Sequence, residues 1–258
     1  VTLMEDSVLI APAPYSNPAA YYFPTLKRMS SLEVLKGAPL LRYGPQTTGG
    51  VINLISAPIP DKQKGYVEAV TNDRGSTDVH ATYGDTNGDW GYLFETVQRS
   101  AQGFKDIDRS NRNSGFDISD YVGKLRWQGD RQSVTAKLQY SEETSNSSYL
   151  GLTDADFSQD PNRRYGLSSI DQMNNTHSGI SLTHQFEWND TVSSTTTLYR
   201  NDFKRNWFKL SGGGNIIDAA NAGDANAQGI LAGTVDTSGI NYKNNAREYV
   251  SQGVQTNF

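Results

Sequence analysis

The sequence of 258 residues contains no cysteine. This absence excludes a disulfide framework and any metal site built from thiolates, and it suits export through an oxidising compartment. Histidine is also sparse: His80, His177 and His184 are scattered, without the HExxH spacing of a zinc site. GxSxG and GxGxxG are absent too. We therefore expect no enzyme, and no cofactor or metal held by protein ligands.

Long hydrophobic runs are missing as well. No stretch approaches the roughly 18 apolar residues of a transmembrane helix, and mean hydropathy is −0.61. Strands that alternate apolar and polar residues can still cross a bilayer at low average hydropathy. The formal charge of −5 is mild and no basic stripe is present, which argues against nucleic-acid binding. Nothing at the amino terminus reads as a signal peptide.

The most informative stretch is Leu32–Pro58, LEVLKGAPLLRYGPQTTGGVINLISAP. Two short apolar runs, 32–35 and 51–55, are each bounded by turn residues, which predicts two buried strands. Between them, Gly44 and Pro45 favour a turn, and Gly49-Gly50 allows backbone to approach closely. Taken alone, this pattern also fits an ordinary α+β core with a glycine-rich turn.

These residues carry a specific resemblance. The stretch resembles the end of the plug domain of TonB-dependent outer-membrane receptors, which reads IEVLKGP, then YG, then GGVINIIT. The matching residues, which we take as structural, are Glu33, Lys36, Gly37, Tyr43, Gly44, Gly49, Gly50 and Asn53. The form RYGPQ with GGV is similar to the ferric-citrate (Fe(III) dicitrate) branch of siderophore receptors, and so, more weakly, are the segments 148–154 and 160–165.

From Gly65 onward the hydrophobic period is two. In 133–141, Val134, Ala136, Leu138 and Tyr140 alternate with polar residues, which predicts one face on lipid and one in a lumen. We expect strands near 65–73, 76–84, 89–99, 117–128, 132–143, 177–188, 191–204 and 246–258. Aromatic girdles are expected to include Trp127, Tyr140, Trp188 and Phe258. A soluble β-sandwich would also alternate in this way.

The connections alternate in length. Residues 84–89, 128–131 and 188–191 form tight turns, whereas 100–116, 144–176 and 205–245 are long. Short periplasmic turns and long external loops are typical of outer-membrane barrels. Asp73-Arg74-Gly75 would then be a short external hairpin. The glycine- and alanine-rich 205–245 loop is expected to be mobile.

Candidate ligand contacts follow from the resemblance and from charge. Residues 11–18 are too rich in proline for a helix or central strand, and their place resembles the outward-facing apical loop of the plug. A ferric-citrate complex is anionic, so guanidinium forks, amides and hydroxyls suit it. The candidates are Tyr15, Ser16, Asn17, Gln46, Arg163, Arg164 and Arg205, with Tyr21, Tyr22 and Lys209 as further choices. For each one an ordinary solvated side chain is the competing interpretation.

The resemblance implies an all-β fold: a partial transmembrane antiparallel β-barrel, about eight of ~22 strands, with the C-terminal part of an α+β plug. We place the plug part at 1–62 and the barrel part at 63–258. An eight-stranded barrel has no room for a plug, so we predict an open curved sheet packed beside it, in a chain that is a fragment of a longer receptor.

The function implied is active import of a ferric chelate across the outer membrane of a Gram-negative bacterium, iron being carried as chelate. Outer-membrane lipid is an implied partner. The TonB-ExbB-ExbD complex would supply energy through a plug-borne segment that precedes residue 1. Two alternatives stay open: a receptor of this family for another cargo, such as a vitamin, a sugar or a hydroxamate chelate, and a passive porin or outer-membrane hydrolase. The last alternative predicts no plug.

Overall fold

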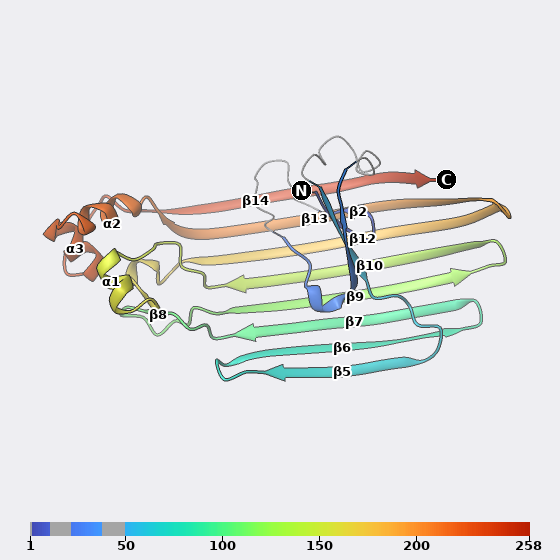
Figure 1. The fold of residues 1–258 in the computed structure, drawn as a ribbon, viewed down its shortest axis with the longest axis horizontal. Helices are drawn as coiled ribbons and strands as arrows, with labels where there is room; N and C mark the ends of the chain where they lie inside the picture. The colour runs from blue at the N-terminus through green and yellow to red at the C-terminus, as the bar shows by residue number, and fades with distance from the viewer. Residues whose placement is uncertain (1, 11–21, 38–49) are drawn as a thin grey trace.

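The computed structural model describes residues 2–10, 22–37 and 50–258. Two main sheets are present, one of four strands and one of eight (Figure 1). Among the helices of these described residues, none is long and apolar enough to cross a bilayer. The open eight-stranded sheet with a smaller sheet beside it is the arrangement that the sequence predicted.

The small sheet has the order β2-β1-β4-β3. Its elements are β1 (Thr2–Glu5), β2 (Val8–Leu9), the 3-10 helix η1 (Leu26–Arg28), β3 (Met29–Leu35) and β4 (Val51–Ser56). Strand β4 pairs in parallel with β1 and antiparallel with β3. The two apolar runs of the signature stretch are therefore neighbouring strands. Leu3, Ile10 and Leu54 are buried in the core of this sheet.

The eight-stranded sheet, here called the wall, runs β14-β13-β12-β10-β9-β7-β6-β5, and every neighbouring pair is antiparallel. Its strands are β5 (Lys64–Thr71), β6 (Ser76–Asn87), β7 (Trp90–Ala101), β9 (Phe116–Gln128), β10 (Gln132–Ser145), β12 (Gln172–Asn189), β13 (Val192–Ser211) and β14 (Asn241–Asn257). All eight coincide with expected strands, but the last three reach five to seven residues further at the ends that adjoin the long connections.

The long connections gather at one end of the wall and the tight turns at the other (Figure 1). The long connections contain β8 (Asp106–Ile107), α1 (Asp154–Gln159), β11 (Arg163–Arg164), the 3-10 helix η3 (Gly166–Ser168), α2 (Gly214–Asn221) and α3 (Ala225–Ala232). The 205–245 connection was expected to be mobile; within it, residues 214–232 form α2 and α3, which bury Ala220, Ala227 and Leu231 in a core shared with the 144–176 connection. Composition missed this because alanine favours a helix once tertiary packing is available. The three long connections, 100–116, 144–176 and 205–245, are called the external segments after the position predicted for them.

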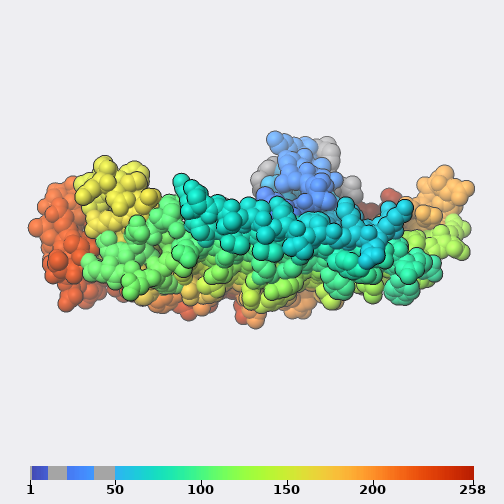
Figure 2. All heavy atoms as spheres, turned by 90° about the horizontal axis from the view of Figure 1, so that it is seen from below, coloured from blue at the N-terminus to red at the C-terminus, as the bar shows by residue number. Residues whose placement is uncertain are grey.

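The small sheet stands on one face of the wall, and no second layer formed by the described residues covers the opposite face (Figure 2). We call the face that carries the small sheet the inner face and the other the outer face. Lys124, Lys137 and Asn201 point inward and contact the small sheet. Leu138 and Ile180 alternate with such residues and are more than half exposed on the outer face. The predicted alternation of the strands is thus confirmed.

Candidate functional site

A buried cluster of charged side chains joins the small sheet to the wall. Glu5, which is 3% exposed, accepts two hydrogen bonds from Arg28, with Nη1–Oε1 and Nη2–Oε2 distances of 2.5 and 2.9 Å. Lys137 of β10 places its Nζ 2.5 Å from Glu5 Oε1 and 2.6 Å from Asp6 Oδ2. Asp120 of β9 lies 3.8 Å from Arg28 Nε. We call Glu5, Asp6, Arg28, Asp120 and Lys137 the docking cluster.

The electrostatics of the cluster keep the members on the small sheet ionised. Burial by itself would raise the pKa of Glu5, but the charges and hydrogen bonds of Lys137 and Arg28 outweigh it and hold that pKa well below its ordinary value. Asp6 follows the same pattern, with Lys137 as its main partner. Burial opposes the charge of Arg28, yet the Glu5 carboxylate raises the pKa of Arg28 above its ordinary value. A neutralised member would leave a charged partner buried.

Further hydrogen bonds fix the small sheet on the wall. Lys124 of β9 donates to Ser56 Oγ at 2.7 Å and to the following backbone carbonyl at 2.6 Å. Two wall residues, Asn201 and Ser251, donate to the backbone carbonyl of Leu9 at 3.2 and 3.0 Å. The β1–β2 hairpin is therefore held through its backbone as well as through its charges.

A polar cavity of about 660 Å³ lies between this hairpin and the wall. Hydroxyl and amide side chains dominate its wall side, among them Thr135, Thr183, Thr195, Thr197, Gln139, Gln185, Asn201 and Gln255. Next to the docking cluster, the Tyr22 ring stacks on His177 with centroids 4.0 Å apart and an angle of 11°. The Phe203 ring lies 5.7 Å from that of Tyr22. The contact between small sheet and wall thus has a charged centre, an aromatic contact and a polar cavity.

Among the plug-signature residues that the structure describes, Glu33, Gly50 and Asn53 have structural roles. Asn53, 1% exposed, donates to Glu33 Oε2 at 2.8 Å and accepts from the backbone N–H of Ser7 at 2.8 Å. Gly50 has a φ of +106°, and an added Cβ would lie 3.2 Å from the Leu35 carbonyl oxygen, so glycine is needed there. Gly37 has a φ of +81°, and Lys36 is exposed. Tyr43, Gly44 and Gly49 lie outside the described residues.

The structure describes three of the main predicted ligand contacts, Arg163, Arg164 and Arg205. Tyr15, Ser16, Asn17, Tyr21 and Gln46 lie outside the described residues. Arg205 is 1% exposed and belongs to β13. Arg163 and Arg164 form β11 in the external segments, which pairs with β8.

Within the external segments, Arg163 is held by two carboxylates. It donates to Asp108 at 3.0 Å and to Asp156 at 2.7 Å, and its guanidinium lies 5.3 Å from the Tyr165 ring centroid. A hydrogen bond from Tyr165, assisted by Arg163, lowers the pKa of Asp156. Arg164 donates to the backbone carbonyls of Pro161 and Arg163. Arg163 therefore ties the 100–116 segment to the 144–176 segment, and Arg164 is the less engaged of the two.

Asp171 is the polar centre of the external segments. It is 1% exposed, and its two carboxylate oxygens accept the backbone N–H groups of Tyr149 and Leu210, both at 2.8 Å. One carboxylate thus connects the 144–176 segment to the end of β13. No group of three or more His, Asp or Glu side chains that could hold a metal ion occurs among the described residues.

Sequence reasoning did not single out Glu5, Arg28, Lys137 or Asp171. One signal was available for Lys137: it belongs to the inward series of β10, and a cation on the inner face of a wall needs a buried partner. Its partners lie 131 and 132 residues away in the chain. No local pattern in the sequence indicates such pairs.

Comparison with solved structures places the fold. The ferric citrate transporter FecA in the unliganded form is similar with a TM-score of 0.68 and 21% identity, over 82% of this chain and 32% of that one. The pyoverdine outer membrane receptor FpvA from Pseudomonas aeruginosa PAO1, bound to pyoverdine, gives 0.66 and 16%, over 82% and 32%. The siderophore receptor PiuA from Acinetobacter baumannii gives 0.65 and 12%, over 80% and 29%.

The chain spans about a third of the length of these receptors. No family model matches the sequence. The structural likeness establishes that the wall and the small sheet have the fold of one part of such receptors.

Proposed function

We propose that this chain is the part of a TonB-dependent outer-membrane receptor that contains the end of the plug, 1–62, and the first barrel strands, 63–258. In this proposal the receptor binds a ferric chelate from outside and imports it with energy from the TonB system. One observation carries the proposal: a small sheet is docked through buried ion pairs on the inner face of a wall whose outer face is apolar over β7, β9, β10 and β12. On β13 the same outer face carries the Arg200–Asp202 ion pair. The likeness to siderophore receptors supports it.

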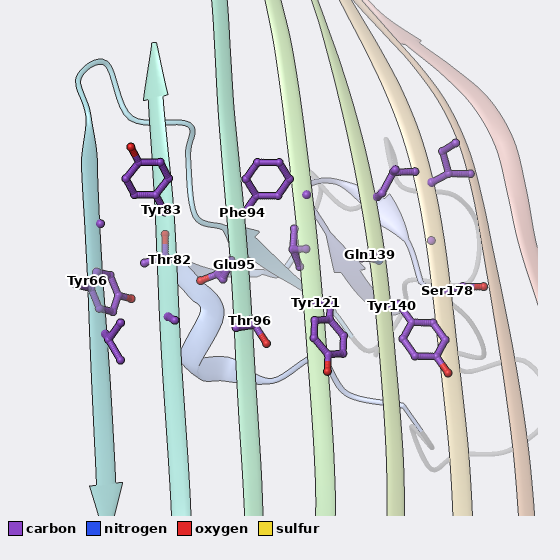
Figure 3. A pocket seen from close by; sticks show the side chains of 18 of the residues that line it. Tyr66, Thr82, Tyr83, Phe94, Glu95, Thr96, Tyr121, Gln139, Tyr140 and Ser178 are labelled. Atoms are coloured by element: carbon purple, nitrogen blue, oxygen red, sulfur yellow. The ribbon is translucent and has the colours of Figure 1, made fainter.

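The outer face has the properties of a lipid-facing surface. Phe94, Leu138 and Ile180 are 55–63% exposed there and border a broad apolar hollow (Figure 3). A first aromatic pair on this outer face, Trp90 and Trp127, lies toward the tight turns. Tyr121 and Tyr140 form a second aromatic pair toward the external segments, and Figure 3 shows both rings.

The two aromatic tiers lie within the height of a bilayer. Tyr121 and Trp127 are both in β9, six residues apart. At about 3.3 Å per residue they lie roughly 20 Å apart along the strand. Strands of outer-membrane barrels tilt by about 35–45°, so this separation covers roughly 15 Å of an apolar band that is about 25 Å tall and flanked by aromatic girdles. We therefore place the bilayer against the outer face, between the tight turns and the external segments.

A Leu138→Arg substitution tests this placement. Leu138 is 58% exposed, so the change should cost less than about 0.5 kcal/mol if the outer face meets water. Against lipid near the middle of the bilayer it should cost about 2–4 kcal/mol. The measurement is denaturant unfolding of the full-length receptor in lipid vesicles. Glu142→Arg, on the same strand and face but beyond the Tyr140 tier, is the control. Equal small losses in both variants would contradict a lipid-facing surface.

The docking cluster suggests how import proceeds. In the proposed mechanism, force on the plug moves the β1–β2 hairpin and separates Glu5 and Asp6 from Lys137. Movement of this hairpin would join the polar cavity beneath it to the space outside the plug. A hydrophilic chelate could pass such a cavity, because threonine, glutamine and asparagine side chains replace water hydrogen bonds along its wall.

For the cargo, we propose ferric citrate or another carboxylate siderophore. The support is the likeness of the RYGPQ and GGV motifs to the ferric-citrate branch, together with the cationic candidates Arg163, Arg164 and Arg205. A receptor of the same fold for another cargo is the second candidate. A passive porin is disfavoured, because β1–β4 form a sheet of their own and add no strands to the wall.

A titration of the full-length receptor with iron-loaded and iron-free citrate tests the cargo, with intrinsic tryptophan fluorescence as the readout. We expect saturable binding that is selective for the iron-loaded form. Arg164→Ala should weaken it about ten- to hundredfold, the value of one charge-assisted hydrogen bond. Arg163→Ala should weaken it by loosening the link to Asp108 and Asp156.

Arg131→Ala is the matched control for the titration, because Arg131 lies in a tight turn at the opposite end of the wall and donates to backbone carbonyls of 187 and 188. Competition with hydroxamate and catecholate chelates separates the cargo classes. If the receptor binds another ferric chelate but not ferric citrate, the proposed transport function stands and the carboxylate cargo is rejected.

A further inference from the structure

A lysine at the external end of β13 is held by aromatic rings. Lys209 Nζ lies 3.2 Å from the ring centroid of Tyr149 and 3.9 Å from that of Trp207. The two rings meet edge to face, with centroids 5.4 Å apart at 87°. Trp207 and Lys209 belong to β13, whereas Tyr149 belongs to the 144–176 segment. This contact joins an external segment to the wall through one cation.

The contact lies on the side of β13 that faces inward. Alternation along β13 puts Trp207 and Lys209 on the same face as Phe203, which packs against Tyr22 of the small sheet. From Phe203 to Lys209 is six residues, or roughly 20 Å along the strand. The rings therefore lie on the inner face, displaced from the small sheet toward the external segments.

This face carries two lysines opposite each other. Lys209 lies directly opposite Lys243 of β14. Like charges directly opposite each other in antiparallel strands are destabilising. The nearby carboxylate of Asp171 is engaged by two backbone N–H groups, one on each oxygen. Among the described residues, no carboxylate forms an ion pair with Lys209.

Two buried polar atoms beside the contact lack hydrogen-bond partners among the described residues. These atoms are Trp207 Nε1 and Ser148 Oγ. Buried donors of this kind are rare in native structures. The indole N–H can only donate, so the group that would complete it is an acceptor.

We infer that Tyr149, Trp207 and Lys209 form a latch that an anionic oxygen group of the cargo opens. This inference rests on the proposed function. A carboxylate that reaches the site accepts a hydrogen bond from Lys209 Nζ and one from Trp207 Nε1. Lys209 then leaves the Tyr149 ring, since a charge-assisted hydrogen bond is stronger than a cation–π contact at an accessible site. The 144–176 segment loses one of its ties to β13, so cargo binding is coupled to movement of that segment.

The test compares Lys209→Gln with Lys204→Gln in the full-length receptor. Lys204 is on the same strand but on the outer face, where it pairs with Glu248 at 3.2 Å. With ferric citrate as the probe, we expect Lys209→Gln to weaken binding about tenfold, which corresponds to about 1.4 kcal/mol. Lys204→Gln should bind as the wild type does. Trp207→Phe, which keeps a ring and removes the N–H, should also weaken binding.

Hydrogen exchange of the amides in 149–153 provides a second readout, independent of affinity. In the wild type, ferric citrate should speed exchange there, and iron-free receptor with Lys209→Gln should exchange fast without cargo. Wild-type affinity in Lys209→Gln, or exchange that neither cargo nor the substitution changes, would overturn the latch. If the wild type binds no ferric chelate at all, the proposed function fails. If, in that case, only the cargo-free Lys209→Gln variant exchanges fast, the result would support the contact of Lys209 with Tyr149 as a tie between the 144–176 segment and the wall. It would reject the opening of this contact by cargo.

Discussion

A Glu5→Gln variant is expected to lose about 3–5 kcal/mol of the free energy that holds the small sheet on the wall. The substitution keeps the shape of the side chain but removes the carboxylate that Arg28 and Lys137 share. Both cations are at least nine-tenths buried, and each would lose its closest anionic partner. The measurement is thermal unfolding of the full-length receptor, with release of the small sheet from the wall as the monitored event.

Glu68→Gln is the matched control for this prediction. Glu68 pairs with Lys27 at 3.4 Å, but its side chain is 51% exposed, so the loss should stay below about 1 kcal/mol. A comparable loss in both variants would show that burial of the docking cluster does not determine its contribution. A difference of several kcal/mol would assign the docking energy to Glu5.

The same pair of proteins gives a pH dependence with a defined sign. Because the pKa of Glu5 is lower in the folded chain than in the unfolded chain, its carboxylate stabilises docking fully above its unfolded pKa, about 4.3. This contribution is lost as the pH falls below that value toward the folded pKa. The gap in unfolding midpoint between wild type and Glu5→Gln should therefore be constant from pH 7 to 5 and shrink toward pH 3.

An Asp171→Ala variant is expected to loosen the external segments by roughly 2–6 kcal/mol. Two backbone N–H groups, of Tyr149 and Leu210, would lose their acceptor, and each unsatisfied buried group costs about 1–3 kcal/mol. Hydrogen exchange at these two amides measures the effect directly. Asp171→Asn retains one oxygen acceptor and should protect one of the two amides.

Asp154→Ala controls for the loss of a carboxylate in the same segment, because Asp154 is exposed in the first turn of α1. It should leave exchange at 149 and 210 unchanged. Unchanged exchange in Asp171→Ala as well would mean that the apolar core around Tyr165 and Leu231 holds the segments without the carboxylate.

The sequence predicted the strands of the wall and their two faces, because alternation is a local property. Leu138 and Lys137 are adjacent, and their opposite chemistry alone assigns them to opposite faces. The strands β3 and β4 could be predicted from the signature stretch for the same reason, because apolar runs and turn residues are local signals that extend over only a few positions. Local signals also placed the tight turns and the long connections.

The docking cluster could not be predicted in this way. Glu5, Arg28 and Lys137 come from three elements, and their pairing depends on where the small sheet meets the wall. The sequence did not predict the helices α2 and α3 for a related reason: they depend on burial against Leu150 and Leu210. Of the predicted ligand contacts, Arg163 turned out to be engaged with Asp108 and Asp156, partners that spacing did not reveal.

The parallel pairing of β1 with β4 has a mechanical consequence under the proposed function. Thr2 to Glu5 align with Val51 to Leu54 in one continuous register. A force applied along β1 from its amino-terminal side loads these backbone bonds in shear, so they bear the load together and do not unzip one by one. Glu5, at the far end of the strand, adds its ion pairs to the same load. We therefore expect the small sheet to stay in place under forces below a threshold and to separate in a single step above it. Such behaviour suits a plug that must remain closed between transport events.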